Sequence, residues 1–175
     1  MKTLATYNIK GGVGKTASAV NLAYLAARDG LRTLLWDLDP QGAASYLLRV
    51  RPRVKGGGKA LVRGKRSLEE AVKVTEFDGL DLVPADFTYR NLDLVLGETK
   101  KPTQRITRLL GPMADNYDLA VLDCPPGISL VSAYAAMRPG GRVPSEIHAS
   151  ARSSCDRCSA FSRSRSAASS ASSQP

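Results

Sequence analysis

The chain lacks the features that mark secreted and membrane-embedded proteins. It has only 3 cysteines among 175 residues, which does not suggest a disulfide framework in a chain without a secretory leader. The N-terminus has no basic-then-apolar leader pattern, because polar Asn8 and Lys10 interrupt the first apolar stretch. No apolar run approaches the roughly 18 residues that a membrane helix needs. We therefore expect a cytoplasmic protein without membrane association.

Positive charge is concentrated in two segments. The whole chain has 25 Lys and Arg against 16 Asp and Glu, a net charge of +9. Residues 49–66 contain eight basic groups and no acidic one, and residues 138–175 contain six basic and two acidic groups. By contrast, residues 67–137 contain eleven acidic and six basic groups. The basic excess thus comes from one internal segment and from the C-terminal tail.

The composition changes sharply near Met137. The 38 residues that follow include twelve serines and six arginines and few large apolar side chains. Such a segment cannot offset its loss of conformational entropy by burial. We predict a folded region over residues 1–137 and a disordered Ser/Arg-rich tail over residues 138–175.

The folded region alternates strand and helix patterns. Short apolar runs predict strands at residues 3–8, 33–36, 80–83 and 119–122, and apolar spacing predicts helices at residues 16–28 and 103–114. Gly30 is expected to stop the first helix, and Ser67 with Glu70 forms a capping box that predicts another. This order predicts an α/β fold with a mainly parallel sheet, whose ligands bind beyond the carboxyl ends of the strands.

A glycine-rich loop stands between the first predicted strand and helix. Its sequence is KGGVGKT, residues 10–16. Glycines let consecutive backbone N–H groups surround phosphate oxygens, and the helix that follows adds the positive end of its dipole. Lys15 can reach the β- and γ-phosphates, and the Thr16 hydroxyl can ligate Mg²⁺. The alternative, a turn without function, is weakened by the strand–loop–helix context.

The loop departs from the usual P-loop pattern, which would place glycine where this chain has Ile9, and it has a second lysine, Lys10. In this it resembles the deviant Walker A motif of the ParA/MinD family of ATPases. DLDPQG at residues 37–42 is similar to the family's switch I, and YDLAVLDCPPGIS at residues 117–129 to its Walker B and switch II. The resemblance covers about residues 1–137 and implies a P-loop NTPase-like, doubly wound sheet with flanking helices that is C-terminally incomplete.

The resemblance also implies roles for individual residues. Lys10 corresponds to the lysine that reaches the phosphates of the other subunit in a nucleotide-sandwiched dimer, and Asp39 to the switch I aspartate that positions the attacking water. Asp123 corresponds to the Walker B carboxylate, and Asp37 and Asp123 both correspond to residues that act on the magnesium ion indirectly, without ligating it. The nucleotide-binding set is Gly11, Gly12, Val13, Gly14, Lys15, Thr16 and Asp123, with Thr16 as the direct Mg²⁺ ligand. This division suits phosphoryl transfer, which needs charge neutralisation and an aligned water.

For the whole protein, the resemblance implies an ATPase that uses ATP and Mg²⁺, forms a homodimer on ATP and binds DNA non-specifically in plasmid or chromosome partitioning. It also implies a ParB-like stimulating protein and a cytoplasmic, nucleoid-associated location. A MinD-like positioning ATPase is a less favoured alternative, because the Ser/Arg-rich tail offers no amphipathic helix. A fragment that keeps the phosphate loop but is inactive is the other alternative.

The basic segment, residues 49–66, is a candidate DNA-binding surface. Its positive charges would release counterions from a phosphate backbone, and the glycines at 56–58 predict a mobile loop. The candidate residues are Arg51, Arg53, Lys55, Lys59, Arg63, Lys65 and Arg66. A solvated loop that aids solubility is the alternative.

The three cysteines are not expected to bind metal. Cys124 lies in the DCPP turn and is expected to pack as a small apolar residue. Cys155 and Cys158 form a lone CxxC near His148, whereas a structural zinc site needs four ligands.

The tail itself suggests a shifted reading frame. ParA-like chains typically continue after the segment that ends at Met137 with an Ala-Ala-Asp segment and an apolar strand. Codons permitted for residues 140–145, read one nucleotide later, can encode Ala-Asp-Ala-Phe-Leu. We hypothesise that residues 138–175 are out-of-frame sequence, which inspection of the coding DNA would test.

Overall fold

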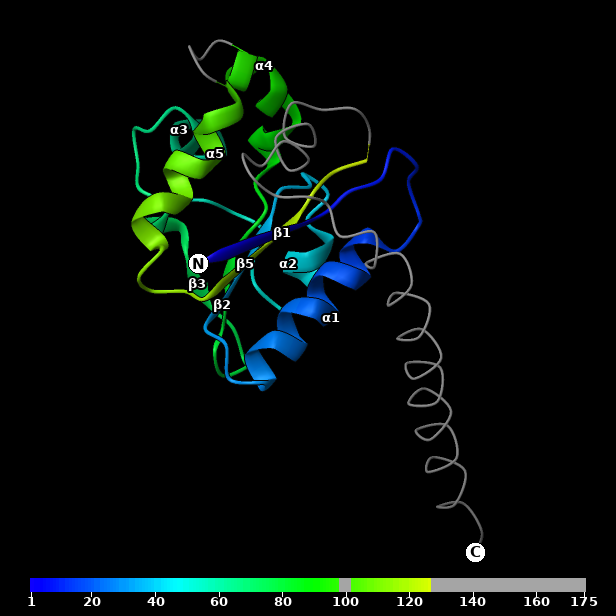
Figure 1. Cartoon of the computed structure of the whole chain (residues 1–175). Coiled ribbons are helices and arrows are strands. Elements are labelled where there is room, and N and C mark those ends of the chain that lie inside the picture. The colour runs from blue at the N-terminus through cyan, green and yellow to red at the C-terminus, as the bar shows by residue number, and fades with distance from the viewer. Residues whose placement is uncertain (98–101, 127–175) are drawn as a thin grey trace, which may run out of the picture. The chain divides into compact units, whose positions relative to one another are not determined.

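The computed structural model describes residues 1–97 and 102–126, in which a five-stranded sheet lies between two layers of helices (Figure 1). The spatial order of the strands is β1 (Lys2–Thr6), β5 (Leu119–Asp123), β2 (Thr33–Asp37), β4 (Leu80–Val83) and β3 (Lys73–Val74). The first four are parallel and β3 is antiparallel to β4. The predicted mainly parallel α/β sheet is confirmed.

Helices cover both faces of this sheet. They are α1 (Lys15–Arg28), α2 (Ala43–Leu47), α3 (Gly58–Val62), α4 (Leu92–Gly97) and α5 (Pro102–Leu110), with single 3₁₀ segments at Glu69–Ala71, Phe87–Asn91 and Gly111–Met113. In Figure 1, α1 and α2 lie on one side of the sheet and α3, α4 and α5 on the other. Successive residues of a strand pack into the cores on opposite faces of the sheet, since side chains alternate along a strand. Leu34 and Trp36 join the α3–α5 core, and Leu35 joins the α1–α2 core.

The strand and helix predictions hold at most positions. β2 is buried at all five residues, as its continuous apolar run predicts. The helix predicted for residues 16–28 is α1, and it ends as expected at Gly30, whose φ of +90° is in the left-handed region. β1 is shifted from the predicted residues 3–8, because Tyr7 and Asn8 already belong to the phosphate loop.

Two helix predictions are wrong in part. The capping box at Ser67 opens a single 3₁₀ turn, Glu69–Ala71, instead of a helix. The Ser67 hydroxyl does accept the Glu70 N–H (3.3 Å), but the Glu70 carboxylate pairs with Arg66 (2.8 Å) and does not return to the cap. The helix predicted for residues 103–114 ends at Leu110, because Pro112 has no N–H to continue the α-helical hydrogen bonds.

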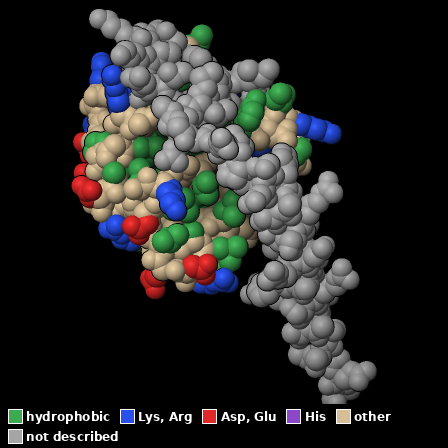
Figure 2. Space-filling model, in the orientation of Figure 1, with side chains coloured by type: hydrophobic (Ala, Val, Ile, Leu, Met, Phe, Trp, Pro, Cys, Tyr) green, Lys and Arg blue, Asp and Glu red, His purple; other side chains and the backbone are tan. Residues whose placement is uncertain are grey.

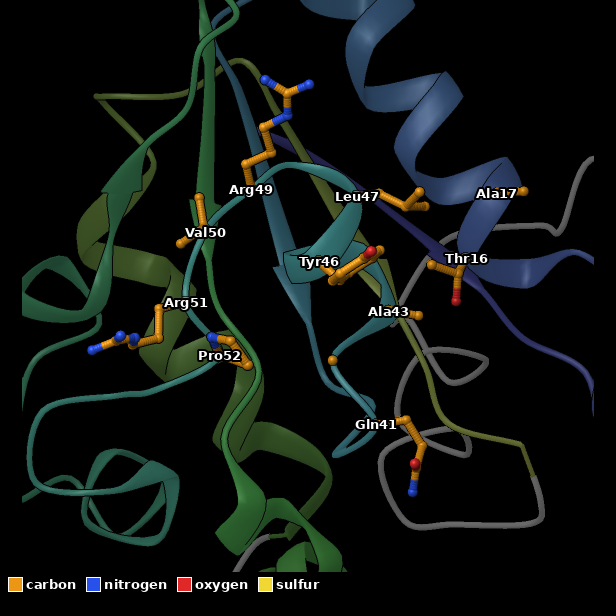
Figure 3. Close-up of a pocket in the computed structure, with 11 residues that line it drawn as sticks. Thr16, Ala17, Gln41, Ala43, Tyr46, Leu47, Arg49, Val50, Arg51 and Pro52 are labelled. Atoms are coloured by element: carbon orange, nitrogen blue, oxygen red, sulfur yellow. The ribbon is translucent and has the colours of Figure 1, made fainter.

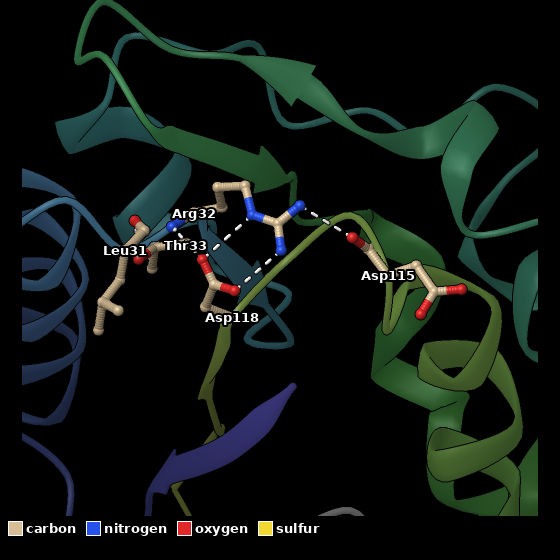
Figure 4. Close-up of polar contacts among 5 residues, drawn as sticks. All are labelled: Leu31, Arg32, Thr33, Asp115 and Asp118. Carbon is tan, nitrogen blue, oxygen red and sulfur yellow. Dashed lines mark hydrogen bonds and ion pairs between the residues drawn. The ribbon is translucent and has the colours of Figure 1, made fainter.

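An ion pair joins the amino ends of β2 and β5 (Figure 4). Arg32 donates from Nε and Nη2 to the two carboxylate oxygens of Asp118, at 3.1 and 2.9 Å, and from Nη1 to the carbonyl of Asp115 at 2.8 Å. The Arg32 guanidinium lowers the pKa of Asp118 to about 2. This cluster fixes the two central strands at the end of the sheet away from the phosphate loop.

The remaining predictions about the chain as a whole fall outside the described residues. The predicted disordered tail, residues 138–175, lies outside them, as do Cys155, Cys158 and His148. Within residues 1–97 and 102–126, no helix combines the length and the apolar character needed to cross a bilayer.

Candidate nucleotide-binding site

Three strands end together and bring polar side chains to one edge of the sheet. β1 ends at Thr6, β2 at Asp37 and β5 at Asp123. Asp123 is the register partner of Thr6 on one side and of Asp37 on the other. Because parallel strands align their carboxyl ends, side chains far apart in the sequence meet here, as predicted.

The glycine-rich loop closes over this edge between β1 and α1. Gly12 and Gly14 have φ values of +71° and +86°, which side-chain-bearing residues rarely adopt. Gly14 is also the N-cap of α1, and no side chain caps the helix there. The first-turn N–H groups of α1 are therefore available to a bound anion. Lys15 folds back over the loop and its Nζ donates to the Lys10 carbonyl at 3.4 Å.

A pocket of about 360 Å³ lies against this loop. Its lining residues are Gly11, Gly12, Gly14, Lys15, Thr16, Ala17, Asp39 and Pro126. Most of the predicted phosphate-loop residues and the predicted water-positioning Asp39 therefore meet in one cavity. Lys10 and Val13 are exposed and are not part of its lining.

Asp123 has one free oxygen in a buried position. Its side chain is 0% exposed, and Oδ1 accepts a hydrogen bond from the Thr6 hydroxyl at 3.3 Å. Oδ2 has no hydrogen-bond partner among the described residues. Burial raises the pKa of Asp123, against the opposing effect of the nearby Thr16 and Thr6 hydroxyls. A buried oxygen without a partner costs free energy, so this position is suited to a cation or to water bound to one.

The few oxygen donors at this edge of the sheet suit a magnesium site that is completed by phosphate and water. They do not suit a metal site made of protein ligands alone. Within the described residues no group of three or more His, Cys, Asp or Glu side chains is placed to hold a metal ion. Mg²⁺ commonly uses one or two protein oxygens together with phosphate oxygens and water. Thr16 and Asp123 supply that kind of donor set beside the loop.

Asp37 holds the segment that follows β2. Its Oδ2 accepts both the backbone N–H and the hydroxyl of Ser45, each at 2.8 Å, and its Oδ1 accepts the Asp39 N–H at 3.3 Å. Burial raises the pKa of Asp37 to about 6, against these hydrogen bonds, and the Asp123 charge adds to the rise. The segment from Asp39 to α2 is thus tied to the end of β2. Asp39 is half-buried and accepts the Gln41 N–H at 2.9 Å.

Sequence reasoning missed two hydroxyl side chains that shape the site. Ser45 donates to Asp37, and its Oγ also accepts the Ala85 N–H (2.9 Å), which connects β2 to the residues after β4. Thr6 donates to Asp123. The available signal was weak: each is a small polar residue at the edge of an apolar run. Cys124 is buried as predicted, and burial raises the pKa of its thiol to about 12.

The basic segment is folded, which contradicts the predicted mobile loop. Val54, Leu61 and Val62 are at most 4% exposed and belong to the core on the α3–α5 side. Asp86 accepts the Val54 N–H at 3.0 Å, and Thr88 accepts the Lys59 N–H at 3.1 Å. The prediction counted charges and glycines and overlooked these apolar side chains.

The candidate DNA-binding side chains lie mostly on the outside of this folded segment. Arg51, Arg53, Lys55, Lys59, Arg63 and Lys65 are exposed, and Arg66 is half-buried and paired with Glu70. Buried apolar residues therefore hold a basic surface in place.

Comparison with known proteins identifies the family. The profile of an AAA domain family, AAA_31, matches residues 1–140. The chain belongs to this ParA/MinD-like P-loop family. It is 35% identical over 138 residues to the chromosome partitioning protein ParA of Caulobacter vibrioides, covering 77% of this chain and 52% of that protein. It is 34% identical over 135 residues to the sporulation initiation inhibitor protein Soj of Bacillus subtilis, covering 77% and 53%.

Solved structures support the same fold. Cobyrinic acid a,c-diamide synthase of Mycobacterium smegmatis, determined with an ATP analogue and magnesium, matches with a TM-score of 0.72 and 26% identity, over 77% of this chain and 55% of that one. The cell division ATPase MinD of Pyrococcus furiosus matches with a TM-score of 0.60 and 25% identity, over 77% and 54%. This AAA_31 chain thus spans about half the length of the relatives it matches.

Proposed function

We propose that this AAA_31 chain binds Mg-ATP at the glycine-rich loop and hydrolyses it as a ParA-type nucleotide switch. The observation that carries the proposal is the cavity shared by Lys15, Thr16 and Asp39, close to the Oδ2 of Asp123, which has no hydrogen-bond partner in the described part of the chain. The similarity to ParA and Soj, and the ATP analogue and magnesium in a neighbour of the same fold, support it.

Each residue has a task in this proposal. The loop N–H groups and Lys15 bind the phosphates and neutralise their charge, and Lys10 reaches the phosphates bound by a second copy. Thr16 would ligate the magnesium ion directly, and Asp123 and Asp37 would act on it indirectly, Asp123 through water bound to the ion; the ion when bound neutralises charge on the phosphate oxygens. Asp39 orients the attacking water, and Asp37 keeps Asp39 in place through the segment that it binds.

Two substitutions separate binding from hydrolysis. Lys15→Ala should weaken ATP binding by about tenfold or more, because it removes a cation from the phosphates. Asp39→Ala should leave ATP binding nearly intact and abolish turnover. Binding is measured by fluorescence anisotropy of a labelled ATP analogue and turnover by phosphate release, with exposed Asp78→Ala as the control. Normal turnover in the Asp39 variant, or unchanged affinity in the Lys15 variant, would contradict the roles.

The second candidate function is a nucleotide-binding protein without turnover. The observation that favours it is that the chain spans about half the length of its relatives. ATP binding that depends on Lys15, together with no phosphate release from the parent chain, would establish this candidate.

We also infer that a dimer of this chain binds DNA through the basic segment, with partitioning as the process and a ParB-like protein as the stimulating partner. Arg51→Gln, Arg53→Gln, Lys55→Gln and Lys59→Gln together should weaken binding equally for unrelated DNA sequences. The slope of log affinity against log salt should fall by about 0.9 for each DNA phosphate that the variant no longer neutralises. Neutralising Lys2, Arg28, Lys73 and Arg90 is the matched control. An unchanged slope would leave the segment as a solvated surface.

A further inference from the structure

A large groove runs along α2, next to the phosphate pocket (Figure 3). Its volume is about 1110 Å³, and its walls come from the start of α1, from α2 and from the first residues of the basic segment. Its apolar lining includes Tyr46, Leu47, Val50 and Pro52. A second pocket of about 400 Å³, lined also by Tyr24 and Phe77, shares Ala17 and Leu47 with it. We call the two together the α2 groove.

The α2 groove exposes side chains of the kind that proteins usually bury. Tyr46 is 82% exposed and Leu47 is 54% exposed, although α2 packs its other face, Ala44 and Ser45, completely. Apolar side chains also gather on the surface over α1 and α2 in Figure 2. A contiguous apolar surface with an aromatic side chain at its centre is typical of a protein-binding site.

The charge of the α2 groove is of one sign. Arg49 and Arg51 line it, and among the described residues no carboxylate does. Arg49 contacts Glu76 at 3.8 Å only, near the limit for an ion pair, and its side chain is 81% exposed. In Figure 3 the two arginines extend from either side of Val50, so charge flanks the apolar floor. The matching partner has acidic groups next to apolar ones.

We propose that the α2 groove binds a peptide segment of a partner protein in which aromatic or aliphatic side chains alternate with Asp or Glu. The apolar side chains contact Tyr46, Leu47 and Pro52, and the carboxylates pair with Arg49 and Arg51. This goes beyond ATP hydrolysis and DNA binding, and its test requires neither activity, although Arg51 belongs both to this groove and to the proposed DNA-binding set.

The α2 groove is joined to the nucleotide site by covalent and hydrogen-bonded structure. Thr16 and Ala17 line both the groove and the phosphate pocket. α2 is tied to the end of β2 through the Ser45–Asp37 hydrogen bonds. A segment bound here touches the same elements that hold Thr16 and Asp39, so nucleotide and peptide should change each other's affinity by the same factor.

The experiment selects random twelve-residue peptides displayed on phage against the whole immobilised 175-residue chain. The peptide that is most enriched is then synthesised with a fluorescent label and titrated by anisotropy. We expect enrichment of acidic peptides with aromatic or aliphatic residues. Tyr46→Ser or Leu47→Ser should weaken the peptide about tenfold or more, since a central aromatic or aliphatic anchor dominates such interfaces. Leu94→Ser, at an exposed leucine of α4, is the matched control and should not change it.

Reversing the charge of the two groove arginines distinguishes specific binding from non-specific hydrophobic binding. Selection against Arg49→Glu/Arg51→Glu should enrich basic peptides in place of acidic ones. Peptides without charge preference, or equal binding to the Tyr46→Ser and parent chains, would overturn the proposal. Sedimentation showing that Tyr46→Ser abolishes self-association would overturn it in favour of a second copy as the occupant.

Discussion

Burial of the Asp37 carboxyl makes the free energy of unfolding of the nucleotide-free protein depend on pH. Its carboxyl is 0% exposed and has a pKa of about 6, because burial disfavours the charged form. The folded protein therefore binds a proton more tightly than the unfolded chain does between pH about 4 and about 6. By linkage, the free energy of unfolding falls as the pH rises through this window, by an amount on the order of 2–3 kcal/mol.

Asp37→Asn should remove the part of this fall that Asp37 contributes, since the amide does not ionise, and leave the part that comes from Asp123, whose pKa burial also raises. The free energy of unfolding without nucleotide or Mg²⁺ is measured by urea titration at pH values from about 4 to about 7. The emission of Trp36, which is 1% exposed and is the chain's one tryptophan, reports unfolding. Asp78→Asn, at an exposed carboxyl, should keep the slope of the parent chain. An Asp37→Asn slope equal to that of the parent would show that Asp37 titrates normally.

At the scale of elements, α3 owes its position to one glycine. A Cβ at Gly58 would lie 2.0 Å from the ring of Tyr89, which is 3% exposed and whose hydroxyl accepts the Trp36 indole N–H at 3.3 Å. The ring cannot give way without disturbing β2. Through the contact of Gly58 with Tyr89 and the hydrogen bond of Tyr89 with Trp36, the basic segment is packed against β2, the strand that ends at Asp37.

Gly58→Ala should destabilise the protein by about 1–3 kcal/mol, because overpacking outweighs the gain of about 1 kcal/mol in helix propensity. Urea unfolding followed by Trp36 emission measures the change. Gly111→Ala is the control, since nothing lies within 4 Å of its Cβ position. Equal effects of the two substitutions would show that the Tyr89 contact carries no energy.

Elements with strong periodicity could be predicted from the sequence, and elements stabilised by tertiary contacts could not. α1, β2, β4 and β5 follow from apolar spacing alone. β3 has two residues, both exposed, and no local pattern distinguishes it. Besides the Gly58 contact, the position of α3 depends on Asp86, which accepts hydrogen bonds from Val54 and Thr88. Although burial would raise the pKa of Asp86, these hydrogen bonds lower it.

The same distinction applies to the site. The phosphate loop, Asp39 and Asp123 are recognisable because the chemistry demands those residue types at strand ends. Ser45 is not, because its role arises only when Asp37, eight positions earlier, and Ala85, forty positions later, meet at its hydroxyl. The roles of the individual site residues stay predictions until the Lys15 and Asp39 variants are measured.

At the scale of the whole molecule, β1 is the outermost described strand on its side of the sheet. It pairs with β5 alone among the described strands, and Leu4 is 39% exposed. A strand edge with unpaired backbone groups favours edge-to-edge association.

Leu4→Lys should slow the growth of light scattering at high protein concentration, because a charge on an edge strand opposes association. ATP affinity should stay unchanged, since Leu4 is not part of the pocket lining. Leu94→Lys adds the same charge on α4 and controls for solubility. Equal scattering from the Leu4 variant and the parent chain would place the associating surface elsewhere.

The strand order also has a consequence for synthesis. β1 is made first, yet its described partner is β5, and the hydrogen bond from Thr6 to the Leu122 carbonyl spans 116 positions in the chain. At the usual translation speed, β1 waits on the order of ten seconds for β5 to be made. During that time β2 can pair with β4, but the phosphate loop has no complete sheet edge beneath it. The nascent chain should therefore bind nucleotide only after residue 123 has left the ribosome, which gives chaperones a defined interval in which to act.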